Sequence, residues 1–375
     1  MIFAVAIISI FYFTIIWAFI IGFETLKNTE NKNSTPKITF SIVVPFRNEF
    51  ENLPVLLHSF SEIDYPTSMF EIILVNDASS DNYNPIIEAF KTKNPHINCT
   101  LINNNNVTNS PKKDALTAAI KISKFNWIVT TDADCKVQKN WLKLFNQTIE
   151  DKNASFIAAP VKFKYEATFL HSFQNLNFMS LMGSTIGSFG IKKPILCNGA
   201  NLCYNKATFL ELNGFEGNTS IASGDDVFLL EKIAQKYPAN VCYLKAKEAI
   251  VETSSEKNWN LFLNQQLRWA SKTTAYNNWF SKFVGLTVFI ENLLVITLGF
   301  STLFISEYWK YFVIVFISKF VLDFILIFKT AKLLKHRKTL NYYAIITLFY
   351  PIFIVFIALT SLFKNYQWKD RIFKK

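Results

Sequence analysis

The feature that most constrains this sequence is a set of four long apolar segments, one at the N-terminus and three near the C-terminus. Residues 1–23 carry no charged side chain, and at about 1.5 Å per residue they can span roughly 30 Å of hydrocarbon. The other three lie at about 283–306, 311–328 and 342–363. We therefore expect an integral membrane protein with one N-terminal and about three C-terminal membrane helices.

The composition narrows the class of partner. Half of the 375 residues are hydrophobic and 18% are charged, which excludes a disordered chain. The net charge is +11, but only four residues are arginines, which argues against nucleic acid and favours anionic lipid. The five cysteines show no C-x-x-C spacing, so neither a disulfide framework nor a zinc site is indicated.

Residues 24–282 separate the first apolar segment from the other three and are long enough for one large α/β domain. The first lysines, Lys27 and Lys32, follow residues 1–23 rather than precede them. We therefore expect this segment to stay attached as a membrane helix, with its N-terminus outside. Residues 283–375 form the C-terminal membrane region.

The last apolar segment poses a problem of orientation, because basic residues flank it on both sides. The positive-inside rule would hold if residues 342–363 folded back at Pro351 as a re-entrant or interfacial hairpin. Glu291, Lys319 and Asp323 lie inside apolar segments. Lys319 and Asp323 can neutralise each other on one helix face, and the alternative is a role in lining an acceptor path.

The domain at 24–282 alternates strand and helix patterns. Strands are expected at Ile38–Pro45, Phe70–Asn76, Asn98–Asn103 and Trp127–Asp132, and helices at Leu53–Ile63, Pro85–Phe90 and Asp114–Ser123. This order predicts a mostly parallel sheet with helices on both faces, whose ligands bind at the carboxyl ends of the strands.

Polar and acidic residues stand at those strand ends. They are Arg47, Asn48 and Glu49 after the first strand, Asn76 and Asp77 at the end of the second, and Asp132 and Asp134 after the fourth. Alone, a D-x-D pair is more often a solvated turn, but here it directly follows a buried strand. Carboxylates without histidine indicate a hard cation, Mg²⁺ or Mn²⁺, shared with substrate phosphates.

These motifs occur in the order found in the family 2 glycosyltransferases, which the chain resembles from about residue 41 to residue 269. The motifs are Val44–Glu49, Asn76–Asp81, Lys112–Leu116, Asp132–Asp134, Gly224–Asp226 and Gln265–Trp269. The resemblance implies a GT-A fold and an inverting enzyme that takes a sugar from a nucleotide-sugar. The G-x-G-x-x-G fingerprint of dinucleotide-binding folds is missing.

The resemblance also implies a nucleotide pocket. Asp77 is similar to the aspartate that hydrogen-bonds the base, which favours a UDP-linked donor, although the preceding residue is Asn76 where the family usually has an acidic one. Pro45, Arg47 and Glu49 would flank the base. An Arg47–Glu49 pair that only stabilises the loop is an equally good interpretation.

The diphosphate and the metal would be held by neighbouring residues. The resemblance makes Asp134 the metal ligand and places Asp132 on the ribose or on the same ion, Mg²⁺ or Mn²⁺, which neutralises charge on the leaving nucleotide. Lys112 or Lys113 would supply a further cation, although one of the two is nearly as well explained as a solvated helix start.

Direct displacement at the anomeric carbon requires a base for the acceptor hydroxyl. Asp226 matches this residue, and Asp225 stands where glutamate is common in the family. The alternative for Asp225 is an acidic residue at the N-terminus of a helix.

The acceptor site is expected from two further motifs. Asn198 and Gly199 resemble the turn behind the acceptor, where glycine allows close backbone approach. Gln265, Arg268 and Trp269 would lie on one side of a helix, with Arg268 near the diphosphate and Trp269 near the acceptor sugar.

Two apolar regions keep alternative interpretations. Trp259, Phe262 and Leu267 indicate a helix against the bilayer surface. The stretch Phe173–Phe189 is equally consistent with a core helix and with a lipid-side acceptor groove.

The expected partners are a nucleotide-sugar donor, the bilayer, and a membrane-lipid or cell-envelope glycan acceptor, with the catalytic domain in the cytoplasm at a bacterial inner membrane. A processive polysaccharide synthase is the second hypothesis, because Gln-x-x-Arg-Trp is common in such enzymes. An inactive nucleotide-binding membrane scaffold is the third, but the chain keeps Asp77, Asp132, Asp134 and Asp226.

Overall fold

The computed structural model describes residues 2–32, 34–369 and 371–373. The chain forms two compact units, each made of separate segments. We call Lys27–Lys164 with Leu196–Ser254 the sheet unit, and Met1–Leu26 with Tyr165–Ile195 and Ser255–Lys375 the helical unit. The domain boundaries at residues 24 and 282 remain a prediction. The division into two compact units does not define which residues lie in a bilayer.

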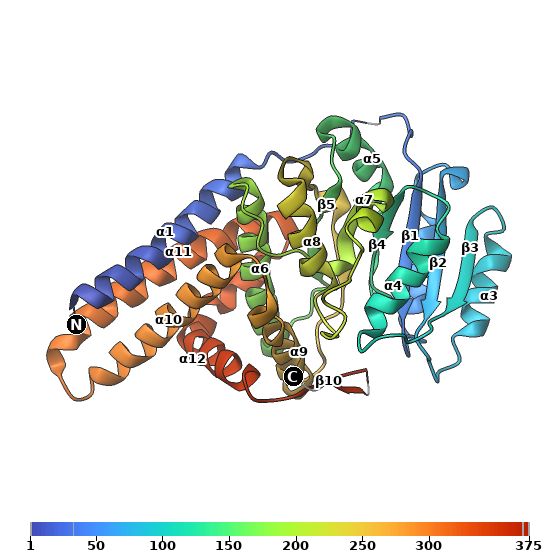
Figure 1. The fold of residues 1–375 in the computed structure, drawn as a ribbon. Coiled ribbons are helices and arrows are strands. Elements are labelled where there is room, and N and C mark those ends of the chain that lie inside the picture. Colours follow the sequence, from blue (N-terminus) through green and yellow to red (C-terminus); the bar gives the residue numbers. More distant parts are fainter. Residues whose placement is uncertain (1, 33, 370, 374–375) are drawn as a thin grey trace. The chain divides into compact units, whose positions relative to one another are not determined.

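The sheet unit is built on a seven-stranded sheet with the order β3-β2-β1-β4-β7-β5-β8 (Figure 1). Its strands are β1 (Phe40–Phe46), β2 (Phe70–Asn76), β3 (Asn98–Asn103), β4 (Trp127–Thr130), β5 (Phe156–Ala158), β7 (Leu202–Asn205) and β8 (Val241–Tyr243). The strands β1 to β4 pair in parallel, and β7 runs antiparallel to β4 and β5. The predicted mostly parallel sheet is thus confirmed.

The central strands form because their residues are apolar or β-branched and are buried. All residues of β2 and β4 are buried, as is every residue of β1 except Pro45, which is half-buried beside Val75. Runs of this kind suit a parallel sheet that is covered on both faces. The register Phe46↔Asn76 and Asn76↔Asn103 brings the ends of β1, β2 and β3 to one edge.

Helices connect these strands. In the sheet unit they are α2 (Leu53–Ser61), α3 (Asn84–Lys93), α4 (Pro111–Ile122), α5 (Trp141–Lys152), α7 (Lys206–Glu211) and α8 (Asp225–Lys236). A second, two-stranded sheet pairs β6 (Val161–Phe163) with β9 (Val251–Thr253) in parallel. Helix α4 packs against β1 and β2, so its first turn lies near the strand ends.

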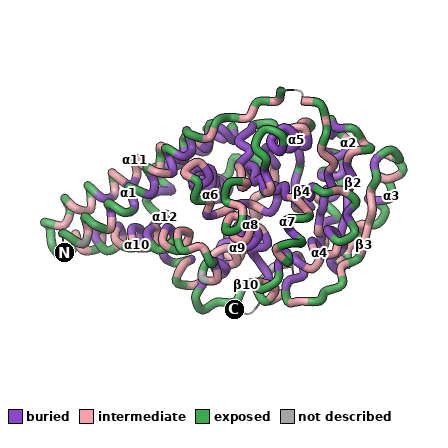
Figure 2. The backbone as a smooth tube through the Cα atoms, turned by 45° about the horizontal axis from the view of Figure 1, so that its top comes forward, coloured by how far each residue is buried: buried purple, intermediate pink, exposed green. Residues whose placement is uncertain are grey.

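The helical unit contains six long helices and a terminal hairpin. They are α1 (Ile2–Thr25), α6 (Phe169–Gly190), α9 (Trp259–Ser271), α10 (Trp279–Ser301), α11 (Trp309–Leu334), α12 (Tyr343–Ser361), β10 (Tyr366–Trp368) and β11 (Arg371–Phe373). Four of the helices, α1, α10, α11 and α12, are long and apolar enough to cross a membrane, as predicted. Exposed and buried residues alternate along α1, α10 and α11 (Figure 2).

Glycines allow α1 and α6 to pack with their backbones in contact. A Cβ atom on Gly190 would lie 1.9 Å from the carbonyl oxygen of Gly22, and one on Gly187 would lie 2.4 Å from that of Phe19. Small residues permit this close approach between membrane helices. Helix α6 is mostly buried, which favours the core interpretation of Phe173–Phe189 over a lipid-side groove.

The charged residues inside the apolar helices have partners within the helical unit. Lys319 pairs with Asp323, as predicted, and Tyr12 donates a hydrogen bond to Asp323 across 2.6 Å. The hydroxyl of Ser9 lies 3.2 Å and 3.3 Å from the two carboxylate oxygens of Glu291. These contacts join α1 to α10 and α11, and they match the internal ion-pair interpretation.

The expected hairpin at Pro351 is not formed. Helix α12 continues through Pro351, and its contacts with α9 and α10 offset the cost of the one backbone donor that proline lacks. The rings of Phe353 and Phe262 stack at 5.4 Å, and Leu267 packs against Ile357. Phe262 and Leu267 therefore face α12 from α9, which corrects the expectation that they contact the bilayer.

Candidate active site

Hydrogen bonds join the loops that follow β1 and β2. The Nη1 atom of Arg47 donates to the carbonyl oxygens of Asp77 at 2.9 Å and Ala78 at 2.7 Å. Asn48 adopts a positive φ of 53°, and its Oδ1 accepts from the amide of Ser80 at 2.8 Å. Arg47 therefore fixes the loop that carries Asp77. The place of Arg47 beside the base pocket remains a prediction.

Asp77 is buried at the edge of the sheet, with 5% of its surface exposed. Its Oδ1 accepts from Nδ2 of Asn104 at 3.0 Å. Asn76 donates to Asn103 Oδ1 at 3.0 Å and to Tyr83. The buried Glu49, after β1, accepts from Asn52 at 2.5 Å. These contacts hold Asp77 and Glu49 in defined positions at the strand ends.

A cluster of one lysine and three carboxylates lies at the end of β4. The Nζ atom of Lys112 is 2.7 Å from Asp132 Oδ1 and 3.6 Å from Asp225 Oδ2. Burial disfavours the ammonium ion, but the carboxylates of Asp132, Asp225 and Asp226 outweigh it and raise the pKa of Lys112 above its ordinary value. Lys112 is thus a permanent cation that links α4, β4 and α8.

Asp226 lies in the first turn of α8 and accepts hydrogen bonds from two backbone amides. Its Oδ2 accepts from the amide of Gly199 at 3.2 Å, and its Oδ1 accepts from the amide of Val227 at 2.8 Å. Asp226 is half-buried, whereas Asp225 is buried. The more accessible of the two carboxylates is therefore Asp226, and its role as the base remains a prediction.

Gly199 lets the chain after α6 approach this cluster closely. A Cβ atom on Gly199 would lie 3.1 Å from Asp225 Oδ2 and 3.6 Å from Asp226 Cβ. Thr130, the last residue of β4, donates to the carbonyl oxygen of Gly199 at 2.9 Å. Asn198 caps the following turn by accepting from the backbone amide of Ala200 at 3.0 Å. Asn198 and Gly199 thus adjoin the acidic cluster.

Asp132 and Asp134 present only oxygen donors, which suit Mg²⁺ or Mn²⁺. Asp134 Oδ2 accepts from the hydroxyl of Thr253 at 2.9 Å, an interaction that orients the carboxylate as outer-shell partners of metal ligands do. Within residues 2–32, 34–369 and 371–373, no three His, Cys, Asp or Glu side chains gather to hold a metal. The two aspartates fit a metal that also binds the oxygens of a diphosphate.

Lys113 points away from the acidic cluster. Its side chain is 1% exposed, and Nζ donates to the carbonyl oxygens of Asn218 and Ile221, each at 2.7 Å. The ammonium also lies 4.9 Å from the ring centre of Phe228. Lys113 therefore fixes the segment before α8, and Lys112 is the lysine of the pair beside the carboxylates.

Gln265, Arg268 and Trp269 lie on α9 in the helical unit. Gln265 Nε2 donates to Glu256 Oε1 at 3.0 Å, and the ring of Trp269 lies 6.2 Å from that of Phe178. Their place beside the acidic cluster of the sheet unit remains a prediction.

Sequence reasoning missed two polar residues of the site. Asn104 follows β3 directly, and this position could have indicated the strand-end site. Thr253 belongs to a strand of three residues, and no local pattern pointed to its contact with Asp134.

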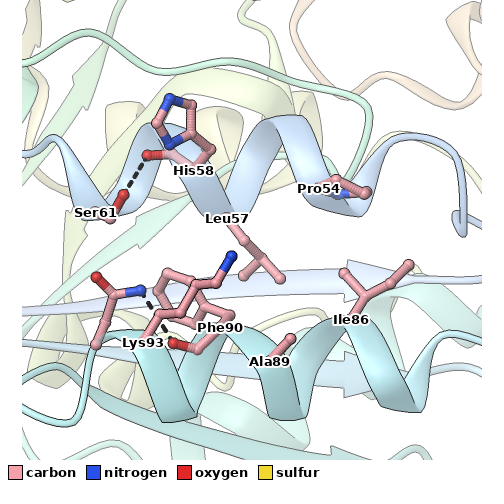
Figure 3. A pocket seen from close by; sticks show the side chains of 9 residues that line it. Pro54, Leu57, His58, Ser61, Ile86, Ala89, Phe90 and Lys93 are labelled. Atoms are coloured by element: carbon pink, nitrogen blue, oxygen red, sulfur yellow. Dashed lines mark hydrogen bonds between the residues drawn. The ribbon is translucent and has the colours of Figure 1, made fainter.

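A groove of about 510 Å³ lies between α2 and α3 (Figure 3). It is lined by Pro54, Leu57, His58, Ser61, Ile86, Ala89, Phe90, Lys93 and Asn94. None of the residues predicted for the site lines this groove. We therefore take the cluster of Lys112 and the carboxylates at the end of β4, and not the groove, as the candidate active site.

The family model described as glycosyl transferase family 21 matches residues 1–374. The chain is 24% identical over 244 residues to the probable glycosyltransferase YdaM of Bacillus subtilis, covering 64% of this chain and 56% of YdaM. It is 38% identical over 96 residues to an undecaprenyl-phosphate 4-deoxy-4-formamido-L-arabinose transferase of Yersinia enterocolitica, covering 25% of this chain and 28% of that protein.

The fold is similar to a solved structure over almost its whole length. The mannosyltransferase PcManGT of Pyrobaculum calidifontis, in complex with GDP-Man and Mn²⁺, matches with a TM-score of 0.58 and 15% identity. The match covers 96% of this chain and 98% of that one. The chain spans between 21% and 56% of the length of the curated relatives it matches.

Proposed function

Because the chain belongs to glycosyl transferase family 21, we propose that it transfers a sugar, with inversion, from a nucleotide-sugar to an acceptor carried by a membrane lipid or a cell-envelope glycan. The observation that carries this proposal is the cluster of Lys112, Asp132, Asp225 and Asp226 beside Gly199. It combines a fixed cation for a diphosphate with carboxylates for a metal and for a proton.

The donor would be bound at the edge formed by β1, β2 and β4. Asp77 is the residue for the base, and as an acceptor it suits the N3–H donor of uracil, so the donor is UDP-linked. Its position is supported by Arg47, whose guanidinium donates to the backbone of the same loop. Pro45 and Glu49 shape the neighbouring wall.

Asp132 and Asp134 would hold a divalent cation, Mg²⁺ or Mn²⁺, together with the diphosphate. The bound ion would neutralise charge on the leaving nucleoside diphosphate. Thr253 orients Asp134 by its hydrogen bond. Lys112 adds a protein cation that is held at 2.7 Å from Asp132, where it can contact phosphate oxygens.

Asp226 would take the proton from the acceptor hydroxyl as that oxygen attacks the anomeric carbon. The amides of Gly199 and Val227 fix the position of the carboxylate. Asp225, buried beside Lys112, positions the start of α8. The acceptor would contact Asn198 and Gly199, with Gln265, Arg268 and Trp269 supplied by α9.

The membrane helices would hold the sheet unit at the cytoplasmic face of a bacterial inner membrane, where nucleotide-sugars are available. In this arrangement, α1 begins outside and the sheet unit follows it inside. The contacts of α1 with α6, α10 and α11 support its retention as part of the helical unit.

Purified membranes should be incubated with a panel of UDP- and GDP-sugars plus Mn²⁺, with nucleotide release and labelled lipid or polymer as readouts. We expect release with a UDP-sugar and a labelled product of limited length. A long polymer would instead favour a processive synthase. Absence of transfer with every donor, despite nucleotide binding, would support the inactive scaffold.

A further inference from the structure

Helix α12 is long enough to cross a bilayer, at about 1.5 Å for each of its 19 residues. Basic residues, however, flank this helix at both ends. They are Lys332, Lys335, Arg337 and Lys338 before the helix, and Lys364, Lys369 and Arg371 after it. Basic residues near membrane helices normally lie on one side of the membrane. The positions of the two ends of α12 therefore bear on whether this helix crosses the bilayer.

The segment before α12 is joined to the start of α6. This segment, η7 (Arg337–Tyr342), follows His336, whose Nδ1 lies 2.5 Å from Nδ2 of Asn175. Lys338 Nζ lies 6.0 Å from the ring centre of Tyr165. Tyr165 is two residues beyond Phe163, where β6 ends, so it lies within about 7 Å of the sheet unit. The beginning of α12 thus lies near Tyr165, which the chain joins directly to β6.

The segment after α12 is joined to the start of α9. Strand β10 packs against α9. Burial raises the pKa of Glu256, and the charges of Arg268 and Lys369 oppose this rise, so Lys369 lies near Glu256. Glu256 is three residues beyond Thr253, where β9 ends, and it lies within about 11 Å of the sheet unit. The segment after α12 therefore lies near Glu256, which the chain joins directly to β9.

Packing between α9 and α12 leads to the same conclusion. Phe262 stacks on Phe353, and Leu267 packs against Ile357. Both contacts advance in the same direction, so the two helices run parallel. Helix α9 starts six residues after β9 and ends eight residues before α10 begins. Helix α12 thus lies beside a helix that the chain places between β9 and α10.

The exposed side of α12 is an apolar stripe. It consists of Ile345, Leu348, Phe349, Ile352, Phe356 and Leu359, each exposed by 47% or more. Their spacing of three and four residues places them on one helix face. These side chains suit a hydrocarbon environment, and the long lysine and arginine side chains at both ends of the helix can extend to lipid headgroups.

We propose that α12 does not cross the bilayer but lies in the leaflet on the side of the sheet unit, with its apolar stripe among acyl chains and its basic flanks at anionic lipid headgroups. This inference rests on the proposed membrane crossing of α1, α10 and α11. It satisfies the positive-inside rule without a hairpin at Pro351. It also gives α9, which carries Gln265, Arg268 and Trp269, a lipid-anchored helix to pack against.

Single cysteines at exposed positions test the sidedness of α12 in the full chain. The four substitutions are Lys121→Cys in the sheet unit, Lys310→Cys in the first turn of α11, and Lys335→Cys and Lys364→Cys on the two flanks of α12. A membrane-impermeant maleimide is added to intact cells and to inverted vesicles. The unchanged chain, with its five native cysteines, gives the background.

We expect Lys335→Cys and Lys364→Cys to react from the same side as Lys121→Cys, and Lys310→Cys to react from the opposite side. Labelling of Lys364→Cys from the side of Lys310→Cys would overturn the proposal while leaving the membrane crossing intact. Labelling of all four from one side would instead refute the crossing of α10 and α11, on which the proposal rests.

The depth of α12 provides a second measurement. Ile345→Cys, Ile352→Cys and Leu359→Cys are labelled with bimane and reconstituted in phosphatidylglycerol vesicles with nitroxide lipids of graded depth. An interfacial helix should show similar shallow depths at all three positions. A crossing helix would place the label at position 352 about 10 Å deeper than the other two.

Discussion

The ammonium group of Lys112 and the carboxylate of Asp132 lie 2.7 Å apart, which joins the first turn of α4 to the end of β4. The same ammonium lies 3.6 Å from Asp225, at the start of α8. One lysine therefore links Asp132, an expected metal ligand, to Asp225, the residue next to the expected base. This arrangement makes Lys112 important for stability as well as for binding a diphosphate.

Lys112→Met should lower the stability of the protein by about 2 kcal/mol, because it leaves two carboxylates without their hydrogen-bonded cation. The comparison is thermal unfolding of the purified protein in EDTA. Lys121→Met, on the exposed side of the same helix, is the matched control and should unfold like the wild type. Equal unfolding of all three proteins would contradict a structural role for Lys112.

Asp134→Ala should abolish Mn²⁺-dependent binding of UDP, because the diphosphate charge then lacks its metal. Asp132→Ala should weaken binding less, and Thr253→Val should weaken it least, since only the orientation of Asp134 is disturbed. Calorimetry with UDP and Mn²⁺ measures all three affinities. Wild-type affinity in the Asp134 variant would rule out its assignment as a metal ligand.

Gly199→Ala should reduce the rate of sugar transfer by about 10-fold or more while donor affinity changes little. The added methyl group would lie 3.1 Å from Asp225 Oδ2, and a small displacement of Asp226 is enough to lower the rate. Initial rates and UDP affinity are measured on the same preparation. A rate equal to that of the wild type would show that this approach is not needed for catalysis.

Glu256→Gln should stabilise the protein at neutral pH and have little effect near pH 4.5. Burial raises the pKa of the Glu256 carboxyl above its ordinary value of 4.5, against the opposing charge of Arg268. The native state thus binds this proton more tightly than the unfolded chain, so stability falls as pH rises from 4.5 through the folded pKa.

The measurement for Glu256 is the unfolding midpoint of wild type and variant at several pH values between 4.5 and 8. Glu62→Gln, which changes an exposed carboxylate, controls for the loss of charge. A stabilisation that grows as the pH is lowered would reverse the expected sign and contradict the burial of an ionised Glu256.

The parallel half of the sheet could be predicted from the sequence because its strands are short, apolar and bounded by turn residues. The expected strands at Phe70–Asn76 and Asn98–Asn103 have the same bounds as β2 and β3. Ligands of such sheets bind at the carboxyl ends of the strands. This rule pointed to Asp77 after β2 and to Asp132 and Asp134 after β4.

The other half of the site depends on contacts between residues distant in sequence. Strand β7 has four residues and inserts antiparallel between β4 and β5, and no local pattern predicts that pairing. It is this insertion that brings Gly199 to Asp226. The sequence also does not predict the partners of Lys112 and Lys113, because adjacent residues in the first turn of a helix point in different directions.

The proposed sugar transfer depends on Asp226 as the base that receives the proton of the acceptor hydroxyl. Asparagine has nearly the same size and can still contact the amide of Gly199, but it cannot accept that proton at neutral pH. Asp225→Asn is the matched comparison, because Asp225 is the neighbouring acidic residue in the first turn of α8.

The most direct measurement is the rate of sugar transfer by Asp226→Asn, Asp225→Asn and wild type, with the UDP-sugar that the donor panel identifies, alongside donor affinity. We expect Asp226→Asn to keep donor affinity and to lose about 10²- to 10⁴-fold in rate, and Asp225→Asn to lose less. Turnover by Asp226→Asn near the wild-type rate, with Asp225→Asn inactive, would contradict the assignment of the base.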